Sequence, residues 1–213
     1  MRTAALLVAL LVCAGEARAE WFLGAFTGAS HTGSNTLTIS GPATQLAIGP
    51  VDYRSEPFTS PIYYGASVGW TPAGRRLGVE GEWTHTKARA TTGSGLLTRF
   101  DQSHGLNFVL ASAVYRYPVA NGRLRLVARA GGGFTLPHVE GTFNGSHTES
   151  YQYGGLAWQA GAGVELSLWR GLSAMAGGRF TRTAETLDVG GVQVDGTFNT
   201  AHVDFGIGWR FGR

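Results

Sequence analysis

The sequence GGLAWQAGAGVELSLW (residues 154–169) alternates over almost its whole length. Every even-numbered position from Leu156 to Leu168 is apolar, whereas Gln159, Glu165 and several glycines stand at the odd-numbered positions. Because successive side chains of a β-strand point to opposite faces, this period of two predicts one long strand with an apolar face and a polar face. Its length exceeds the roughly 10 residues that a strand needs to cross a bilayer.

The same alternation recurs along the chain and predicts about eight strands, at roughly 20–31, 62–71, 76–90, 100–118, 122–141, 150–169, 171–186 and 198–212. Each strand with a clear pattern has one apolar row that we assign to the face away from the charges. Besides the row of residues 156–168, these rows are Leu106, Phe108, Leu110 and Val114; Leu124, Leu126, Ala128 and Ala130; and Val203, Phe205, Ile207, Trp209 and Phe211.

The opposite faces carry charges, which decides between two all-β architectures. The charged residues at these positions are Glu80, Glu82, Arg125, Arg129, Glu165, Arg179, Asp204 and Arg210. A soluble β-sandwich or a lipocalin-like barrel needs its apolar faces inside, and no helix is predicted to cover them. A closed barrel in lipid turns apolar residues outward and pairs charges in a narrow interior. The sequence therefore predicts an all-β fold, an eight-stranded antiparallel up-and-down transmembrane β-barrel.

Connection lengths fit this architecture. Tight turns at 71–76, 118–122 and 170–171 alternate with longer segments at 32–61, 88–99, 141–150 and 186–197, which are rich in Gly, Ser and Thr. Periplasmic turns and extracellular loops alternate in this way.

The two ends of the chain suggest export and assembly. Residues 1–19 have the basic start, apolar run and Ala17-Arg18-Ala19 ending of a signal peptide, so residues 20–213 are expected to form the barrel domain. The last strand resembles the C-terminal signal that the barrel assembly machinery recognises in bacterial outer-membrane proteins. We expect a monomer in the outer membrane. A net charge of +3 without a dense Lys/Arg stripe argues against nucleic acid as a partner.

Three histidines are predicted to share one outward patch near the loop ends of consecutive strands. His85, His104 and His138 each have the same strand parity as apolar residues of their own strand. Glu140 shares the parity of His138, and a bulge near Pro137 would reverse that assignment. Imidazoles and a carboxylate are suited to metal binding or to general-base catalysis. We assign His85, His104, His138 and Glu140 as candidate catalytic residues.

Two cations of the same strand complete the predicted patch. Lys87 and Arg89 are candidates for binding the phosphates of a lipid substrate. Each of these residues also has a simpler interpretation as an interfacial anchor, because Lys and Arg side chains extend toward lipid headgroups. The residues do not identify a metal; His85, His104 and His138 are its expected ligands if one is bound.

Specific motifs resemble a known family. They are Thr84-His85-x-Lys87, His104-Gly105-x-Asn107, Pro137-His138-Val139-Glu140 and Tyr151-Gln152, in blocks that follow one another along nearly the whole chain after residue 19. These blocks are similar to outer-membrane β-barrel proteins known as lipid A oxidases. The resemblance implies lipid A or lipopolysaccharide as the partner and molecular oxygen as co-substrate. It implies oxidation of the proximal glucosamine to 2-aminogluconate, after loss of its phosphate.

Two functions are therefore weighed. One is an enzyme that acts on lipid A from the outer leaflet; the other is a non-enzymatic small barrel in the manner of OmpA, OmpX or OmpW, with a structural or adhesive role. The residues alone support the two functions equally, and the resemblance favours the enzyme.

Overall fold

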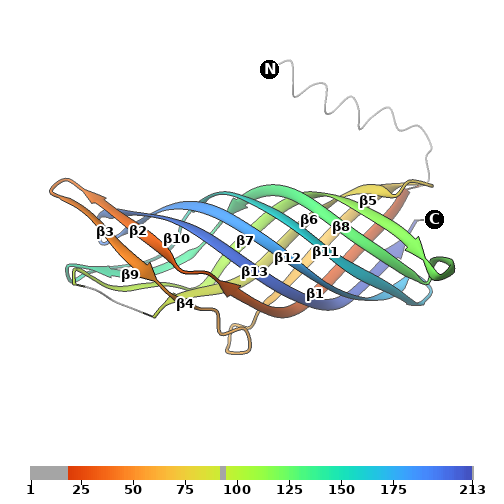
Figure 1. Ribbon diagram of the computed structural model, residues 1–213, viewed down its shortest axis with the longest axis horizontal. Coiled ribbons are helices and arrows are strands. Elements are labelled where there is room, and N and C mark those ends of the chain that lie inside the picture. The colour runs from red at the N-terminus through yellow and green to blue at the C-terminus, as the bar shows by residue number, and fades with distance from the viewer. Residues whose placement is uncertain (1–18, 92–94, 213) are drawn as a thin grey trace, which may run out of the picture.

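The computed structural model describes residues 19–91 and 95–212, and these residues form a closed antiparallel barrel (Figure 1). The ring closes because the last strand pairs with the first, from Trp21 opposite Phe211 to Thr32 opposite Thr200. The predicted all-β, eight-stranded barrel is confirmed. The eight strands of the ring are β1 (Ala19–Thr32), β5 (Tyr64–Pro72), β6 (Leu77–Ala90), β7 (Leu97–Val119), β8 (Leu124–Thr135), β11 (Gly155–Trp169), β12 (Leu172–Val189) and β13 (Val192–Phe211).

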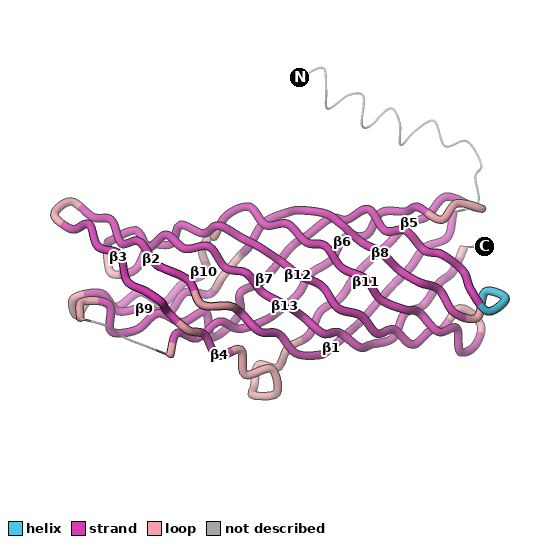
Figure 2. Tube along the Cα trace, viewed as in Figure 1, coloured by secondary structure: helices cyan, strands magenta, loops and turns pink. Residues whose placement is uncertain are grey.

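The two ends of the barrel differ. One end carries the short turns, including the 3-10 helix η1 (Ala120–Gly122), together with the start of β1 and the end of β13 (Figure 2). The other end extends into hairpins. These are built from β2 (Asn35–Gly41), β3 (Thr44–Val51), β4 (Tyr53–Arg54), β9 (His138–Phe143) and β10 (Ser146–Tyr151).

The predicted loops at 141–150 and 186–197 were wrong, because both segments are paired strands. β9 and β10 are joined at Asn144-Gly145, and β12 and β13 at Gly190-Gly191. All four turn residues have positive φ, between 46° and 85°. Such two-residue turns match the twist of the strands they join, so the ladders continue to the turn. A polar Gly/Ser/Thr composition does not separate an exposed hairpin from an irregular loop.

The outer surface is apolar along most of the ring. The alternate rows predicted for β11 and β13 point outward, as Leu156 (76% exposed) and Ile207 (59% exposed) illustrate, while Glu165 is buried inside. Aromatic side chains such as Trp169 and Trp209 lie exposed near the short turns, where aromatic girdles mark a membrane interface.

Strand β7 is an exception. Its row of Leu106, Phe108, Leu110 and Val114 was predicted to face lipid, and all four side chains are buried in the barrel interior. The prediction was wrong because both faces of this strand are apolar. Its outward row consists of Val109, Ala111, Ala113, Tyr115 and Tyr117.

The interior near the short turns is filled by ion pairs. The carboxylate of Glu80 accepts from Arg116 Nη2 at 2.6 Å, and Arg116 Nε is 3.0 Å from Glu165. A second group centres on Glu82, which pairs with Arg129 and with Arg179. Buried charges are stable only when they are paired in this manner. The remaining cavity between these groups is small, about 50 Å³.

An apolar core fills the other end of the interior. It is built from β2, β7, β9, β12 and β13, and it continues beyond the Thr32–Thr200 pair where β1 leaves the ring. Glu185 lies in this extension, opposite Gly196, and is 2% exposed. Its carboxylate accepts hydrogen bonds from Gln102 Nε2 at 2.7 Å and Thr135 Oγ1 at 2.7 Å.

The expected signal peptide falls almost wholly outside the described residues, which begin with Ala19 in β1. No helix among the described residues has the length and hydropathy needed to cross a membrane.

Candidate functional site

A bulge in β7 determines where His104 points. Between the pairs Thr86–Leu106 and Ala88–Gln102, β6 contributes one residue and β7 contributes three, Ser103 to Gly105. Gly105 has φ of 120°, a conformation that favours glycine. The side chains of Gln102 and Leu106 are buried inside, whereas His104 is exposed. His104 therefore leaves the strand on the outer face although its even-numbered neighbours point inward.

His104 meets His138 across the boundary between β7 and β9. The centroids of the two rings are 4.9 Å apart in an edge-to-face arrangement, and the rings of His138 and Tyr151 are 4.7 Å apart. Tyr151 is the cross-strand partner of His138 in the β9–β10 hairpin. Nδ1 of His138 is buried and has no hydrogen-bond partner among the described residues.

His85 lies in the same region, on β6. Its ring packs against Tyr64, with centroids 5.1 Å apart, and against Trp83, with centroids 6.5 Å apart. Nδ1 of His85 is 3.0 Å from Oδ1 of Asn107. Nδ2 of Asn107 donates to the carbonyl of Leu136 at 3.0 Å, which fixes Oδ1 as the acceptor.

This network sets the tautomer of His85. Because Oδ1 of Asn107 only accepts, Nδ1 of His85 carries the proton and Nε2 keeps its lone pair. Nε2 is buried and has no hydrogen-bond partner among the described residues. An oriented imidazole with a free basic nitrogen is the usual form of a general base.

His85 and His104 line an outward-facing hollow of about 400 Å³, which we call the histidine groove. Its floor combines apolar and aromatic side chains with ring nitrogens and an amide, a composition typical of small-molecule sites. His138 borders the groove through its contacts with His104 and Tyr151. The lining residues are Pro61, Tyr64, Trp83, His85, His104, Asn107, Leu136 and Tyr151.

The predicted cations lie beside the groove and are already paired. Nζ of Lys87 donates to the carbonyl of Thr59 at 2.8 Å, under the loop of residues 55–63 that projects from the side of the barrel (Figure 2). Arg89 pairs with Glu56 at 3.0 Å. Both contacts hold this loop against β6, so neither cation lines the groove.

Glu140 is also outside the groove. Its carboxylate is 2.5 Å from Nη1 of Arg99 and accepts a hydrogen bond from Ser103 Oγ at 3.0 Å. The donor atoms of His85, His104 and His138 do not form a ready metal site. Within the described residues, a different group brings three possible ligand atoms within 4.8 Å of one another. It consists of Glu140, His147 and Glu149.

Other residues of the groove were not singled out from the sequence as site residues. Asn107 and Tyr151 stand in the quoted motifs, but nothing in their spacing indicated that Asn107 orients His85.

His202 and Asp204, which were expected inside the barrel, are there. Tyr63 Oη is 3.1 Å from His202 Nδ1 and 2.5 Å from Asp204 Oδ1.

Comparisons with known proteins give a family match and several similar solved structures. A family model described as the outer membrane protein beta-barrel domain matches residues 4–211. Neisserial surface protein A is similar at 14% identity, over 90% of this chain and 97% of that chain, with a TM-score of 0.49. The N-terminal barrel of Pseudomonas aeruginosa OprF is similar at 12% identity, over 91% and 98%, with a TM-score of 0.45. The Escherichia coli outer membrane protease OmpT is similar at 10% identity, over 91% and 96%, with a TM-score of 0.40. A search of curated proteins found no match.

Proposed function

The chain belongs to the outer membrane protein β-barrel family, and on that premise we propose that it is a lipid A-modifying oxidase. The substrate is the proximal glucosamine of lipid A, and the site is the histidine groove. The observation that carries the proposal is that His85 and His104 line one outward hollow and His138 packs against His104 at its border, with His85 Nε2 and His138 Nδ1 unpartnered among the described residues.

The location of the groove suits a lipid substrate. The eight residues from Leu77 to His85 rise about 20 Å at the usual strand tilt, against an apolar band of about 25 Å. The groove therefore lies where hydrocarbon gives way to headgroups. A lipid A molecule would reach it by lateral diffusion, with Tyr64 and Trp83 against its apolar part.

The chemistry follows from the tautomer of His85. The substrate is lipid A without its 1-phosphate, so that C1 of the proximal sugar carries a hydroxyl. Nε2 of His85 takes the hydroxyl proton, the C1–H bond breaks, and the carbonyl of a lactone forms. Dioxygen accepts this hydrogen with its electron pair, takes the proton back from Nε2 of His85, and leaves as hydrogen peroxide. Water then opens the lactone to 2-aminogluconate.

The other groove residues position the sugar in this scheme. His104, which lines the groove, and His138, which packs against it, orient the sugar, and Asn107 keeps His85 in the reactive tautomer. Preorganised partners of this kind contribute to catalysis by orientation. Lys87 and Arg89 act indirectly, through the loop of residues 55–63 that they hold.

A test uses the full barrel folded in detergent and lipid A that lacks the 1-phosphate. Under air, mass spectrometry should find a gain of one oxygen atom on the proximal sugar, together with hydrogen peroxide. Under argon neither product should form. Unchanged lipid A under air would contradict the proposal and would favour the passive barrel of the OmpA, OmpX or OmpW kind.

A further inference from the structure

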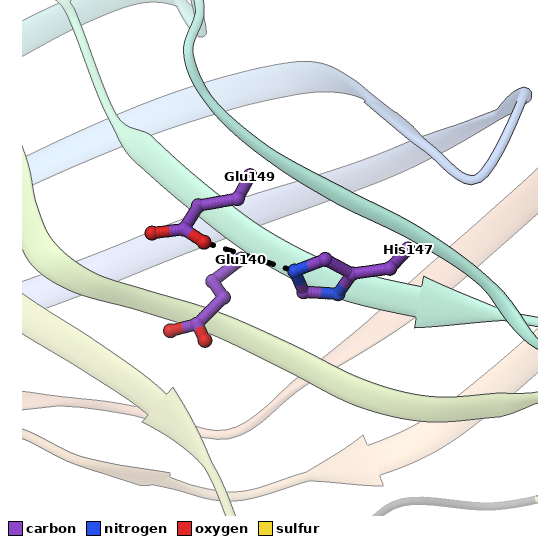
Figure 3. A group of neighbouring side chains, drawn as sticks. All are labelled: Glu140, His147 and Glu149. Carbon is purple, nitrogen blue, oxygen red and sulfur yellow. Dashed lines mark ion pairs between the residues drawn. The ribbon is translucent and has the colours of Figure 1, made fainter.

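We propose that the β9–β10 hairpin binds a divalent transition-metal ion on its outward face, through Glu140, His147 and Glu149. One ligand atom from each of these residues lies within 4.8 Å of the other two. Figure 3 shows the three side chains converging from the two strands of the hairpin. The inference does not depend on the proposed oxidase activity.

The register of the hairpin brings two like charges together. Glu149 stands directly opposite Glu140 in the antiparallel ladder. Like charges in directly opposed positions destabilise a strand pair, and a cation between them removes that repulsion. Within the described residues, Arg99 pairs with Glu140, whereas the charged partner found for Glu149 is His147, at 3.8 Å.

The ring of His147 is oriented toward these carboxylates. Its Nδ1 is 3.1 Å from the hydroxyl of Thr142, its cross-strand partner, and its Nε2 faces Glu149 Oε2. Metal-binding histidines commonly use the other ring nitrogen for a hydrogen bond that fixes the ring. Thr142 provides this second contact here.

The contacts of Glu140 leave it able to bind a metal. Oε1 is held by Arg99 and Oε2 by Ser103, so the carboxylate is fixed in direction. A carboxylate oxygen has two lone-pair sites, and each oxygen uses one of them in these contacts. Arg99 reduces the negative charge of the site, and Glu149 and His147 are the stronger ligands for that reason.

The ligand types indicate which ion the site takes. One imidazole with two carboxylates suits Zn²⁺ or Mn²⁺, whereas Ca²⁺ and Mg²⁺ prefer oxygen ligands alone. About half of the surface of the His147 and Glu149 side chains is exposed, at 47% and 52%, so water can complete the coordination. The site adjoins the histidine groove, because Glu140 and His138 are two residues apart on one strand face.

The test measures Zn²⁺ binding to the full chain, folded in detergent and freed of metal with a chelator, by isothermal titration calorimetry. We expect saturable binding of a single ion, lost in H147Q and in E149Q. The T142V variant should bind about tenfold more weakly, because loss of an orienting contact typically has that effect. H31Q, which alters an exposed histidine of β1, is the matched control and should bind as the unchanged protein does.

Two results would overturn the inference. One is the absence of saturable Zn²⁺ and Mn²⁺ binding by the unchanged protein. The other is binding that H104Q abolishes and H147Q preserves, because this would place the ion in the histidine groove. Heat-modifiable migration in SDS gels shows that each variant is folded, so that loss of binding reports on the site.

Discussion

Replacing Gly105 by Ala should disable the histidine groove while the barrel still folds. A Cβ at this position would lie 2.5 Å from His85 Nδ1 and 2.7 Å from Asn107 Oδ1, the two atoms of the hydrogen bond that sets the tautomer. The backbone φ of 120° adds strain for any residue with a side chain. Strain costs about 1–3 kcal/mol, and overpacking costs a similar amount, about 1–3 kcal/mol.

A matched control separates the two costs. Gly122 also has positive φ, 79°, but apart from its chain neighbours no atom lies within 4 Å of the place that a Cβ would take. G122A should therefore lower the free energy of unfolding by about 1 kcal/mol, and G105A by about 3 kcal/mol. Urea unfolding followed by Trp fluorescence measures both. G105A should also lose lipid A oxidation, whereas G122A keeps it. Equal stability losses, or full activity in G105A, would refute this account of the bulge.

Two further predictions concern buried carboxylates. E82Q leaves the guanidinium groups of Arg129 and Arg179 without their shared carboxylate, so urea unfolding should show a loss of about 3–5 kcal/mol. E56Q removes the carboxylate of a half-buried pair at the loop, with Arg89, and should lose less than about 1 kcal/mol. Equal losses in E82Q and E56Q would contradict this prediction. Burial raises the pKa of Glu185, beyond the closed ring, from 4.5 to about 7. Below pH 4.5 the Glu185 carboxyl is neutral in the folded and in the unfolded protein. As pH rises through 7, the unchanged protein should therefore lose about 3 kcal/mol of its free energy of unfolding. E185Q should not show this loss, and equal pH profiles of the two proteins would contradict the prediction.

The sequence predicted the strand faces wherever the two rows of a strand differ in polarity. In β11, the row from Leu156 to Leu168 is apolar and the other row contains Gln159 and Glu165, so the assignment was unambiguous. In β7, both rows are apolar, because the interior at that level is filled by side chains such as Phe108. Alternation then shows that a strand exists but not which face is inside.

The position of His104 depends on a feature that the sequence does not display. His104 was predicted to point outward because it shares the parity of Leu106, which itself points inward. The bulge at Ser103 to Gly105 places His104 on the outer face nonetheless. The inward direction of the Leu106 row and the reversal of parity by the bulge thus cancel, and His104 points outward as predicted. Bulge positions depend on the register with the neighbouring strand, and one strand's sequence does not contain that register.

The composition of the groove was only partly predictable, for a related reason. Strand parity placed three histidines on consecutive strands, and the structure brings them to one side of the barrel. Asn107 and Tyr151 enter the site through cross-strand contacts. The pairing of Lys87 with Thr59 and of Arg89 with Glu56 depends on the path of the loop of residues 55–63, which has no periodic pattern.

The decisive experiment compares lipid A from cells whose lipid A lacks the 1-phosphate and which produce one of three forms of the chain. We expect the unchanged protein and H31Q, which alters an exposed histidine away from the groove, to add one oxygen atom to the proximal sugar in the presence of air. H85Q should add none, although it folds to the same heat-modifiable barrel. Oxidation by H85Q at the rate of the unchanged protein, or lipid A that all three forms leave unaltered, would contradict the account.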